Sequence, residues 1–158
     1  VAEHSWRIAL MAFWMKDEFP DVDIDKVIRM CLIHDLGECF IGDIPTFAKT
    51  DADEAREEAE LMAWVRSLPE PVSGEMEALY REMIALETPE AKLYKAMDKL
   101  EAIVQHNESD IATWEPHEYQ LNMTYADDAV AWSPVLRELR EAIRNDTKAK
   151  IAAAEQQA

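Results

Sequence analysis

Glycine is almost absent from this chain, and its scarcity limits the possible folds more than any other feature. Only three glycines occur in 158 residues, at positions 37, 42 and 74. Ala, Glu, Leu, Met and Lys, which favour helices, dominate the rest. Alternation of apolar and polar residues, the pattern typical of strands, is hard to find. The sequence therefore predicts an all-α domain of about six or seven helices.

Prolines and capping residues divide the chain into these helices. Thr88–Pro89 and Ser133–Pro134 each combine an N-cap with a proline at the first helical position, and Asp23 or Asp25 can cap an earlier helix. We expect helices over residues 1–19, 23–36, 51–68, 74–87, 88–107 and from 133 onward, a loop or short helical turns at 37–46, and a frayed tail at 152–158.

The length and apolar content indicate one folded domain. A chain of 158 residues corresponds to a single domain, residues 1–158. Its hydrophobic fraction of 49% is too high for a disordered acidic chain. We expect Trp6, Phe13 and Trp14 to pack in the core. Because the chain starts at Val1, with no initiator Met and no evident helix cap, we also expect an upstream segment of the native domain.

The charge excludes several classes of partner. With 33 acidic and 16 basic residues, the formal net charge is −17. Polynucleotides and anionic membranes both attract an excess of Lys and Arg, so neither is an expected partner. No apolar run reaches the length of a membrane span, and no secretory signal is present. Cys31 and Cys39 are most simply free thiols in a reducing compartment, which favours the cytoplasm.

Four side chains with metal-ligating chemistry fall at inward-facing or core-edge positions of three predicted helices. His34 continues an apolar stripe, and Asp35 follows it. His4 precedes apolar residues at helical spacing. Asp98 lies in the middle of a long helix, where a buried aspartate is costly. Taken singly, each has a structural explanation: a core histidine bonded to a carbonyl, a solvated aspartate, or an ion pair of Asp98 with a neighbouring lysine.

Taken together, the four side chains point to a metal. Two imidazoles and two carboxylates suit a divalent transition metal and leave coordination positions open for water or substrate. One ion would satisfy all four otherwise costly groups. Spacing in the sequence does not establish that they converge in space, so at this point a metal site and the structural explanations both stay open.

In chain order, His4, His34–Asp35 and Asp98 resemble the H…HD…D signature of the HD-domain metal-dependent phosphohydrolases. Residues 34–38 (HDLGE) and 42–46 (GDIPT) are similar to one branch, the 5′-deoxynucleotidases of bacteria and their eukaryotic relatives. The resemblance covers about residues 1–105. It implies an HD-domain helical bundle that hydrolyses nucleoside 5′-monophosphates, above all deoxynucleotides, to nucleoside and phosphate.

The resemblance also implies roles for individual residues. The four signature residues would hold one divalent ion, with Mn²⁺, Co²⁺ and Mg²⁺ as candidates. Glu38 and Asp43 match the acidic residues that act around the attacking water and the leaving group, in an order that the sequence leaves open. Arg7, Thr46 and Lys49 are candidates for binding the substrate; their alternative roles are an ion pair with Glu3, an N-cap and a surface lysine.

Other functions remain open beside this one. The chain can be an HD-superfamily phosphohydrolase for another nucleotide (a diphosphate, a cyclic nucleotide or an alarmone), a noncatalytic HD module that binds a metal or nucleotide, or a purely structural bundle. No histidine lies between Asp35 and Asp98, which favours one metal over the two that other HD branches bind. The expected partners are a small-molecule nucleotide and, from family habit, a second copy in a homodimer.

Overall fold

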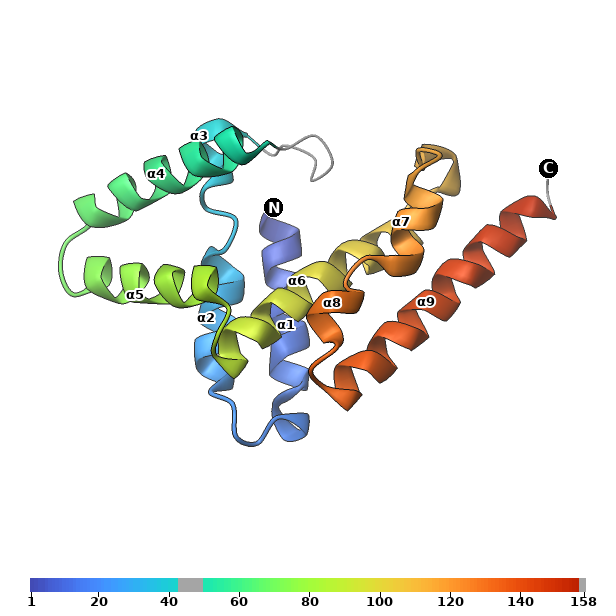
Figure 1. Ribbon diagram of the computed structural model, residues 1–158, viewed down its shortest axis with the longest axis horizontal. Helices are drawn as coiled ribbons and strands as arrows, with labels where there is room; N and C mark the ends of the chain where they lie inside the picture. The colour runs from blue at the N-terminus through green and yellow to red at the C-terminus, as the bar shows by residue number, and fades with distance from the viewer. Residues whose placement is uncertain (43–49, 157–158) are drawn as a thin grey trace.

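A computed structural model describes residues 1–42 and 50–156 of the chain. All regular structure in these residues is helical (Figure 1). The elements are α1 (Ala2–Trp14), η1 (Lys16–Glu18), α2 (Ile24–Ile33), α3 (Glu38–Ile41), α4 (Asp51–Ser67), α5 (Val72–Ala85), α6 (Pro89–Glu108), η2 (Ile111–Thr113), α7 (Glu118–Thr124), α8 (Asp127–Val130) and α9 (Pro134–Glu155). The prediction of an all-α domain is confirmed.

Most helix boundaries agree with the capping signals in the sequence. Seven of the described α-helices have seven or more residues, in line with the expected six or seven. The side chains of Asp23, Thr88 and Ser133 each accept a hydrogen bond from a first-turn amide of the helix that they cap. None of the helices in the described ranges is long and apolar enough to cross a membrane.

Three boundaries differ from the expectation. The first helix ends at Trp14 and a 3₁₀ turn follows, where one helix to residue 19 was expected. The second helix ends at Ile33, so the HD pair lies just beyond it rather than inside it. The last helix extends to Glu155, although residues 152–158 were expected to fray. Its final turns are rich in alanine, the strongest helix former, which accounts for the continuation.

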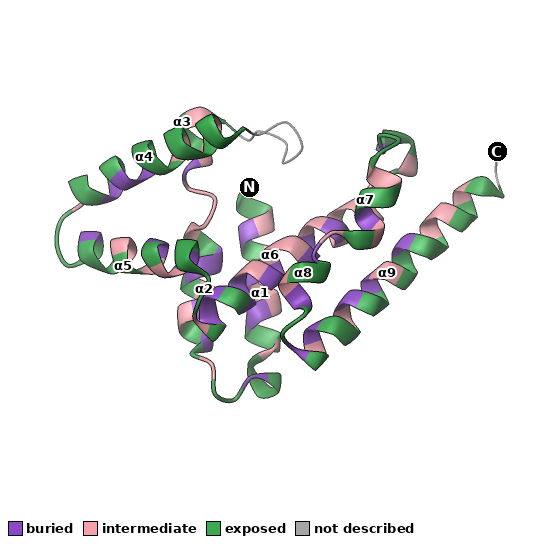
Figure 2. Cartoon of the chain, viewed as in Figure 1, coloured by how far each residue is buried: buried purple, intermediate pink, exposed green. Residues whose placement is uncertain are grey.

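The core lies where α1, α2 and α6 pack against one another (Figure 2). Each helix contributes an inward stripe, and the predicted stripe of the second helix is confirmed. The fully buried residues of these three helices include Ile8, Ala12, Val27, Met30, Cys31, Leu93, Met97 and Leu100. His4, His34 and Asp98 extend the same stripes to the edge of this core, and this arrangement carries them to one place.

Three aromatic residues on α1 do not enter the core, contrary to the expectation. Trp6, Phe13 and Trp14 are 65%, 58% and 69% exposed. The helix carries apolar residues on more than one face, and the face that packs on α2 and α6 is the one with Ile8 and Ala12. Apolar composition alone did not reveal which face would be buried, because both faces are apolar.

A buried arginine joins the C-terminal helices. Arg140 of α9 is 1% exposed. Its Nε donates to the carboxylate of Asp127 at 3.0 Å, and its Nη2 donates to the carbonyl of Asn122 at 3.0 Å. Arg144, one turn further along, binds the same aspartate. This network ties α7 and α8 to α9, which lies alongside α6 (Figure 1).

We expect Arg140→Ala to lower the free energy of unfolding by about 2–4 kcal/mol, because it leaves a cavity and a buried carbonyl without its donor. Urea denaturation followed by circular dichroism measures the change. Arg137→Ala is the matched control: Arg137 is exposed, and its guanidinium donates to the carbonyl of Ala131. It should cost less than about 1 kcal/mol. Equal losses in the two variants would contradict the role given to Arg140.

Candidate metal centre

His4, in the first turn of α1, is one of four side chains at the candidate metal centre; the others are His34, Asp35 and Asp98. Its Nε2 lies 3.1 Å from Oδ1 of Asp98. On the other side of the ring, Nδ1 donates a short hydrogen bond to the carboxylate of Glu101. The imidazole is therefore held by one carboxylate from behind, and its Nε2 points toward the other carboxylate and the centre.

The HD pair reaches the centre because α2 ends immediately before it. His34 is the C-cap of α2, and its Nδ1 donates to the carbonyl of Cys31 at 2.8 Å. Its Nε2 lies 2.9 Å from Oδ1 of Asp35 and 3.7 Å from Oδ1 of Asp98. The His34 side chain is only 4% exposed, and within the described ranges its buried Nε2 has no hydrogen-bond partner of acceptable geometry.

Asp98 comes from the middle of α6, the helix that packs on both α1 and α2. Its Oδ1 contacts both imidazoles, while its Oδ2 accepts a hydrogen bond from Nζ of Lys95 at 2.7 Å. The lysine lies one turn earlier on the same helix. The two carboxylate oxygens thus have different partners, and the one that faces the histidines is the one available to a cation.

This arrangement fits a single divalent ion. Ligand atoms of His4, His34 and Asp35 lie within 4.8 Å of one another, and Asp98 contacts both histidines. Two ligand atoms that are each about 2.1 Å from an ion are separated by at most about 4.2 Å, and the distances of 3.1 and 3.7 Å from Asp98 Oδ1 to the two Nε2 atoms lie below that limit. In both rings Nδ1 is engaged elsewhere, which leaves Nε2 to bind a metal.

The charges around the centre also favour a cation. Burial lowers the pKa of His4, but the carboxylates bonded to the ring outweigh that effect and raise the pKa to about 9. Burial likewise lowers the pKa of His34, whereas Asp35 and Asp98 raise it to about 9. Burial raises the pKa of Asp98, but its histidine partners hold that pKa well below the usual value. In the absence of a metal these carboxylates keep protons on the rings, and a metal must displace those protons.

Sequence reasoning missed Glu101, which supports His4 from behind. Its side chain is 0% exposed, and besides His4 it contacts Nε of Arg7 at 2.8 Å. Carboxylates commonly orient metal-binding histidines in this way. Its position three residues after Asp98, on the buried face of a long helix, was the signal that could have identified it. Arg7, a candidate for binding the substrate with an ion pair to Glu3 as its alternative role, contacts the carboxylates of Glu101 and Glu108.

The remaining predicted site residues are placed only in part. Glu38 begins α3, and its amide donates to the carbonyl of Asp35 at 3.1 Å, so it lies one turn beyond the HD pair. Gly42, the C-cap of α3, has a positive φ of 88°, a conformation that glycine adopts without strain. Asp43, Thr46 and Lys49 lie outside the described residues.

A hollow of about 290 Å³ opens beside the centre, between α4, α5 and α6. His34 lies in its wall together with Tyr80, Tyr94 and Lys95. Glu54, Glu57 and Glu58 of α4 also line it. Burial raises the pKa of Tyr94 to about 12, so its phenol stays neutral and its O–H remains a donor. A ligand in this hollow would reach His34 directly.

The sequence comparisons agree on one family. The family model of the HD domain matches residues 1–140. The chain is 34% identical over 110 residues to the 5′-deoxynucleotidase HDDC2 of Bos taurus, which covers 68% of this chain and 53% of the relative. It is 32% identical over 122 residues to the Homo sapiens protein of the same name, covering 76% and 59%. The chain thus spans little more than half the length of these curated relatives.

Solved structures share the fold. A predicted metal-dependent phosphohydrolase from Magnetospirillum magnetotacticum superposes with a TM-score of 0.76 at 31% identity, covering 94% of this chain and 77% of that chain. The PH0347 protein from Pyrococcus horikoshii superposes with a TM-score of 0.73 at 25% identity, covering 92% and 83%.

Proposed function

Because the chain belongs to the HD-domain family, whose model matches residues 1–140, we propose that it is a metal-dependent phosphomonoesterase. Its substrates would be nucleoside 5′-monophosphates, with deoxynucleotides preferred, and its products nucleoside and phosphate. The similarity to proteins named 5′-deoxynucleotidase supports this substrate class.

One observation carries the proposal: His4, His34, Asp35 and Asp98 converge from three parts of the chain. Ligand atoms of His4, His34 and Asp35 lie within 4.8 Å of one another, and Asp98 Oδ1 lies 3.1 and 3.7 Å from the two Nε2 atoms. Both Nδ1 atoms have other partners, so each Nε2 is left for a metal, which supports the proposal. We assign one divalent ion to these four residues, with Mn²⁺, Co²⁺ and Mg²⁺ as the candidates. Such an ion supplies positive charge against the phosphate and lowers the pKa of water that it binds.

The acidic residues near the HD pair would move the protons. Glu38 lies one turn beyond Asp35, where its carboxylate can orient the attacking water or accept its proton. Asp43 would donate a proton to the departing 5′-oxygen, and the two roles can be exchanged. Thr46 and Lys49 would hold the phosphate by a hydroxyl hydrogen bond and a positive charge. Arg7 would act through Glu101 in orienting His4, given its contact at 2.8 Å.

The hollow beside His34 would hold the nucleoside. Its tyrosines and apolar side chains offer surface to a base, and the glutamates of α4 can accept hydrogen bonds from sugar hydroxyls and base amino groups. The same glutamates repel phosphate. The phosphate would therefore lie at the metal end of the hollow, where Lys95 also stands.

We also propose a cytoplasmic homodimer. Within the described ranges Cys31 and Cys39 form no disulfide, which fits a reducing compartment. Trp6, Phe13 and Trp14 of α1 are exposed, and large exposed apolar side chains on one helix support an interface there.

The decisive experiment measures phosphate release after chelation and re-addition of single metals. The panel contains the deoxynucleoside 5′-monophosphates, their ribose counterparts, the 3′-monophosphates as matched controls, and nucleoside diphosphates and cyclic nucleotides. We expect release from the 5′-monophosphates, fastest with deoxyribose, and no release from the chelated protein or from the 3′ esters. Preferential release from a diphosphate or a cyclic nucleotide would favour another HD phosphohydrolase. Metal binding without release from any compound would favour a noncatalytic module.

A further inference from the structure

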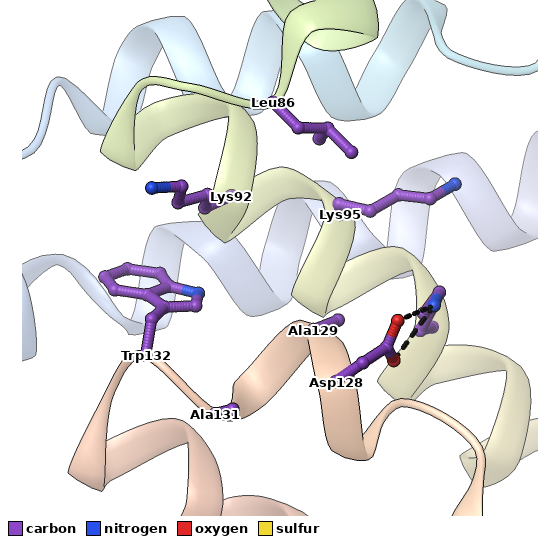
Figure 3. Close-up of a pocket in the computed structure, with 8 residues that line it drawn as sticks. Leu86, Lys92, Lys95, Asp128, Ala129, Ala131 and Trp132 are labelled. Carbon is purple, nitrogen blue, oxygen red and sulfur yellow. Dashed lines mark hydrogen bonds and ion pairs between the residues drawn. The ribbon is translucent and has the colours of Figure 1, made fainter.

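A second and larger hollow lies on the other side of Lys95. Its volume is about 540 Å³, against about 290 Å³ beside the metal centre. Lys95 and Leu86 line both hollows and so form a shared wall. Figure 3 shows Lys92 and Lys95 along α6 on one side of the hollow, and Asp128 to Trp132 at and after α8 on the other. None of the four proposed metal ligands lines it.

The hollow gathers positive charge on a strongly negative protein. Lys92, Lys95 and Lys99 follow one another at spacings of three and four residues, so they share one face of α6. Among the described residues that line it, Asp128 is the only acid. In a chain with net charge −17, three lysines around one hollow make it a local site for an anion.

The three amines differ in their partners. Lys95 binds Asp98 at 2.7 Å, and Lys99 binds both oxygens of Asp128 at 3.0 and 3.1 Å. Lys92 is exposed and forms no ion pair within the described ranges. An incoming anion therefore meets one unpaired amine at Lys92, and it competes with Asp128 for Lys99.

The rest of the hollow suits a planar ring. Trp132 is 38% exposed and stands across the hollow from α6 (Figure 3). Phe19 packs on Trp132 with ring centroids 5.7 Å apart, which fixes the position of the indole. Leu86, Ala129 and Ala131 and the methylene chains of the lysines complete an apolar wall. Bases stack on aromatic side chains of this kind where nucleic acids bind proteins.

We propose that this hollow is a binding site for a nucleotide, separate from the metal centre. The base would stack on Trp132, and the phosphates would bind Lys92 and Lys99. The volume lies within the range of about 300–1,000 Å³ that is typical of small-molecule sites. The proposal does not depend on phosphomonoesterase activity, since the site contains none of the metal ligands.

Equilibrium dialysis with labelled ADP tests the site on the metal-loaded and the chelated protein. ADP is a diphosphate and so differs from the monoesters assigned to the metal centre. We expect one ADP site that survives chelation. Lys92→Glu should raise its Kd about tenfold by reversing a charge beside the phosphates. Asp128→Asn should lower the Kd by about threefold, because it removes the carboxylate that competes with the phosphates for Lys99. Lys150→Glu, which makes the same charge change on α9, is the control and should leave the Kd unchanged.

The Asp128→Asn variant is expected to bind ADP more tightly. A variant that failed to fold would lose binding, so misfolding cannot produce the expected result. Inorganic pyrophosphate should bind more weakly than ADP because it has no ring to stack on Trp132. Binding of ADP that disappears on chelation and ignores Lys92→Glu would place ADP at the metal centre and overturn the proposal. So would the absence of ADP binding, or pyrophosphate binding as tight as that of ADP. Phosphate release from deoxynucleotides by Lys92→Glu should equal that of the unaltered protein, which keeps this test separate from the proposed activity.

Discussion

Asp98→Asn should abolish metal-dependent phosphate release. The Asp98 carboxylate contacts both imidazoles, at 3.1 Å from His4 and 3.7 Å from His34. Removal of a residue that only hydrogen-bonds a metal ligand typically lowers metal affinity or activity about 10–100-fold. Removal of a ligand itself should therefore lower the activity by more than about 100-fold. Phosphate release from deoxynucleoside 5′-monophosphates at saturating metal measures the effect.

A second readout separates loss of the metal from loss of the fold. An ion that binds only the folded state raises the melting temperature of the protein. We expect that rise in the unaltered protein and in Asp146→Asn, which changes an exposed aspartate on α9, but not in Asp98→Asn. Normal phosphate release and a normal metal-induced rise in Asp98→Asn would remove this residue from the ligand set.

Glu101→Gln should weaken metal binding by about 10–100-fold while leaving every proposed ligand in place. The Glu101 carboxylate is fully buried and binds His4 Nδ1, so it orients the ring and increases the electron density at Nε2. An amide in its place keeps the shape but loses the charge. Titration of Mn²⁺ or Co²⁺ into the chelated protein gives the affinity, and activity at saturating metal should recover in large part.

Glu108→Gln is the control for this prediction. Glu108 also binds Arg7, at 2.7 Å, but it is 61% exposed and has no contact with His4 among those that the structure gives for it. We expect the metal affinity of the Glu108→Gln protein to stay within about twofold of that of the unaltered protein, because exposed ion pairs contribute little energy. Equal losses in Glu101→Gln and Glu108→Gln would mean that Arg7, rather than the bond to His4, determines the affinity.

Local features of the sequence were sufficient for most of the long helices and several of their N-caps, but not for η2, α7 and α8. The N-caps Asp23, Thr88 and Ser133 were predictable because capping depends on residues within one turn. The HD strings likewise identified the family, since they are contiguous. The exposure of Trp6 and Trp14 was not predictable in this way, because α1 is apolar on more than one face and only packing selects the face that is buried.

In the candidate site, too, some features follow from local sequence and others only from tertiary packing. The types of ligand and their inward-facing positions follow from the sequence, because helical periodicity is a local property. Two features depend on how distant helices pack: Glu101 stands behind His4, 97 residues away, and three lysines of α6 line the same hollow as Trp132. Side-chain packing selects one arrangement of helices from many with the same periodicity, so these contacts appear only in the folded chain.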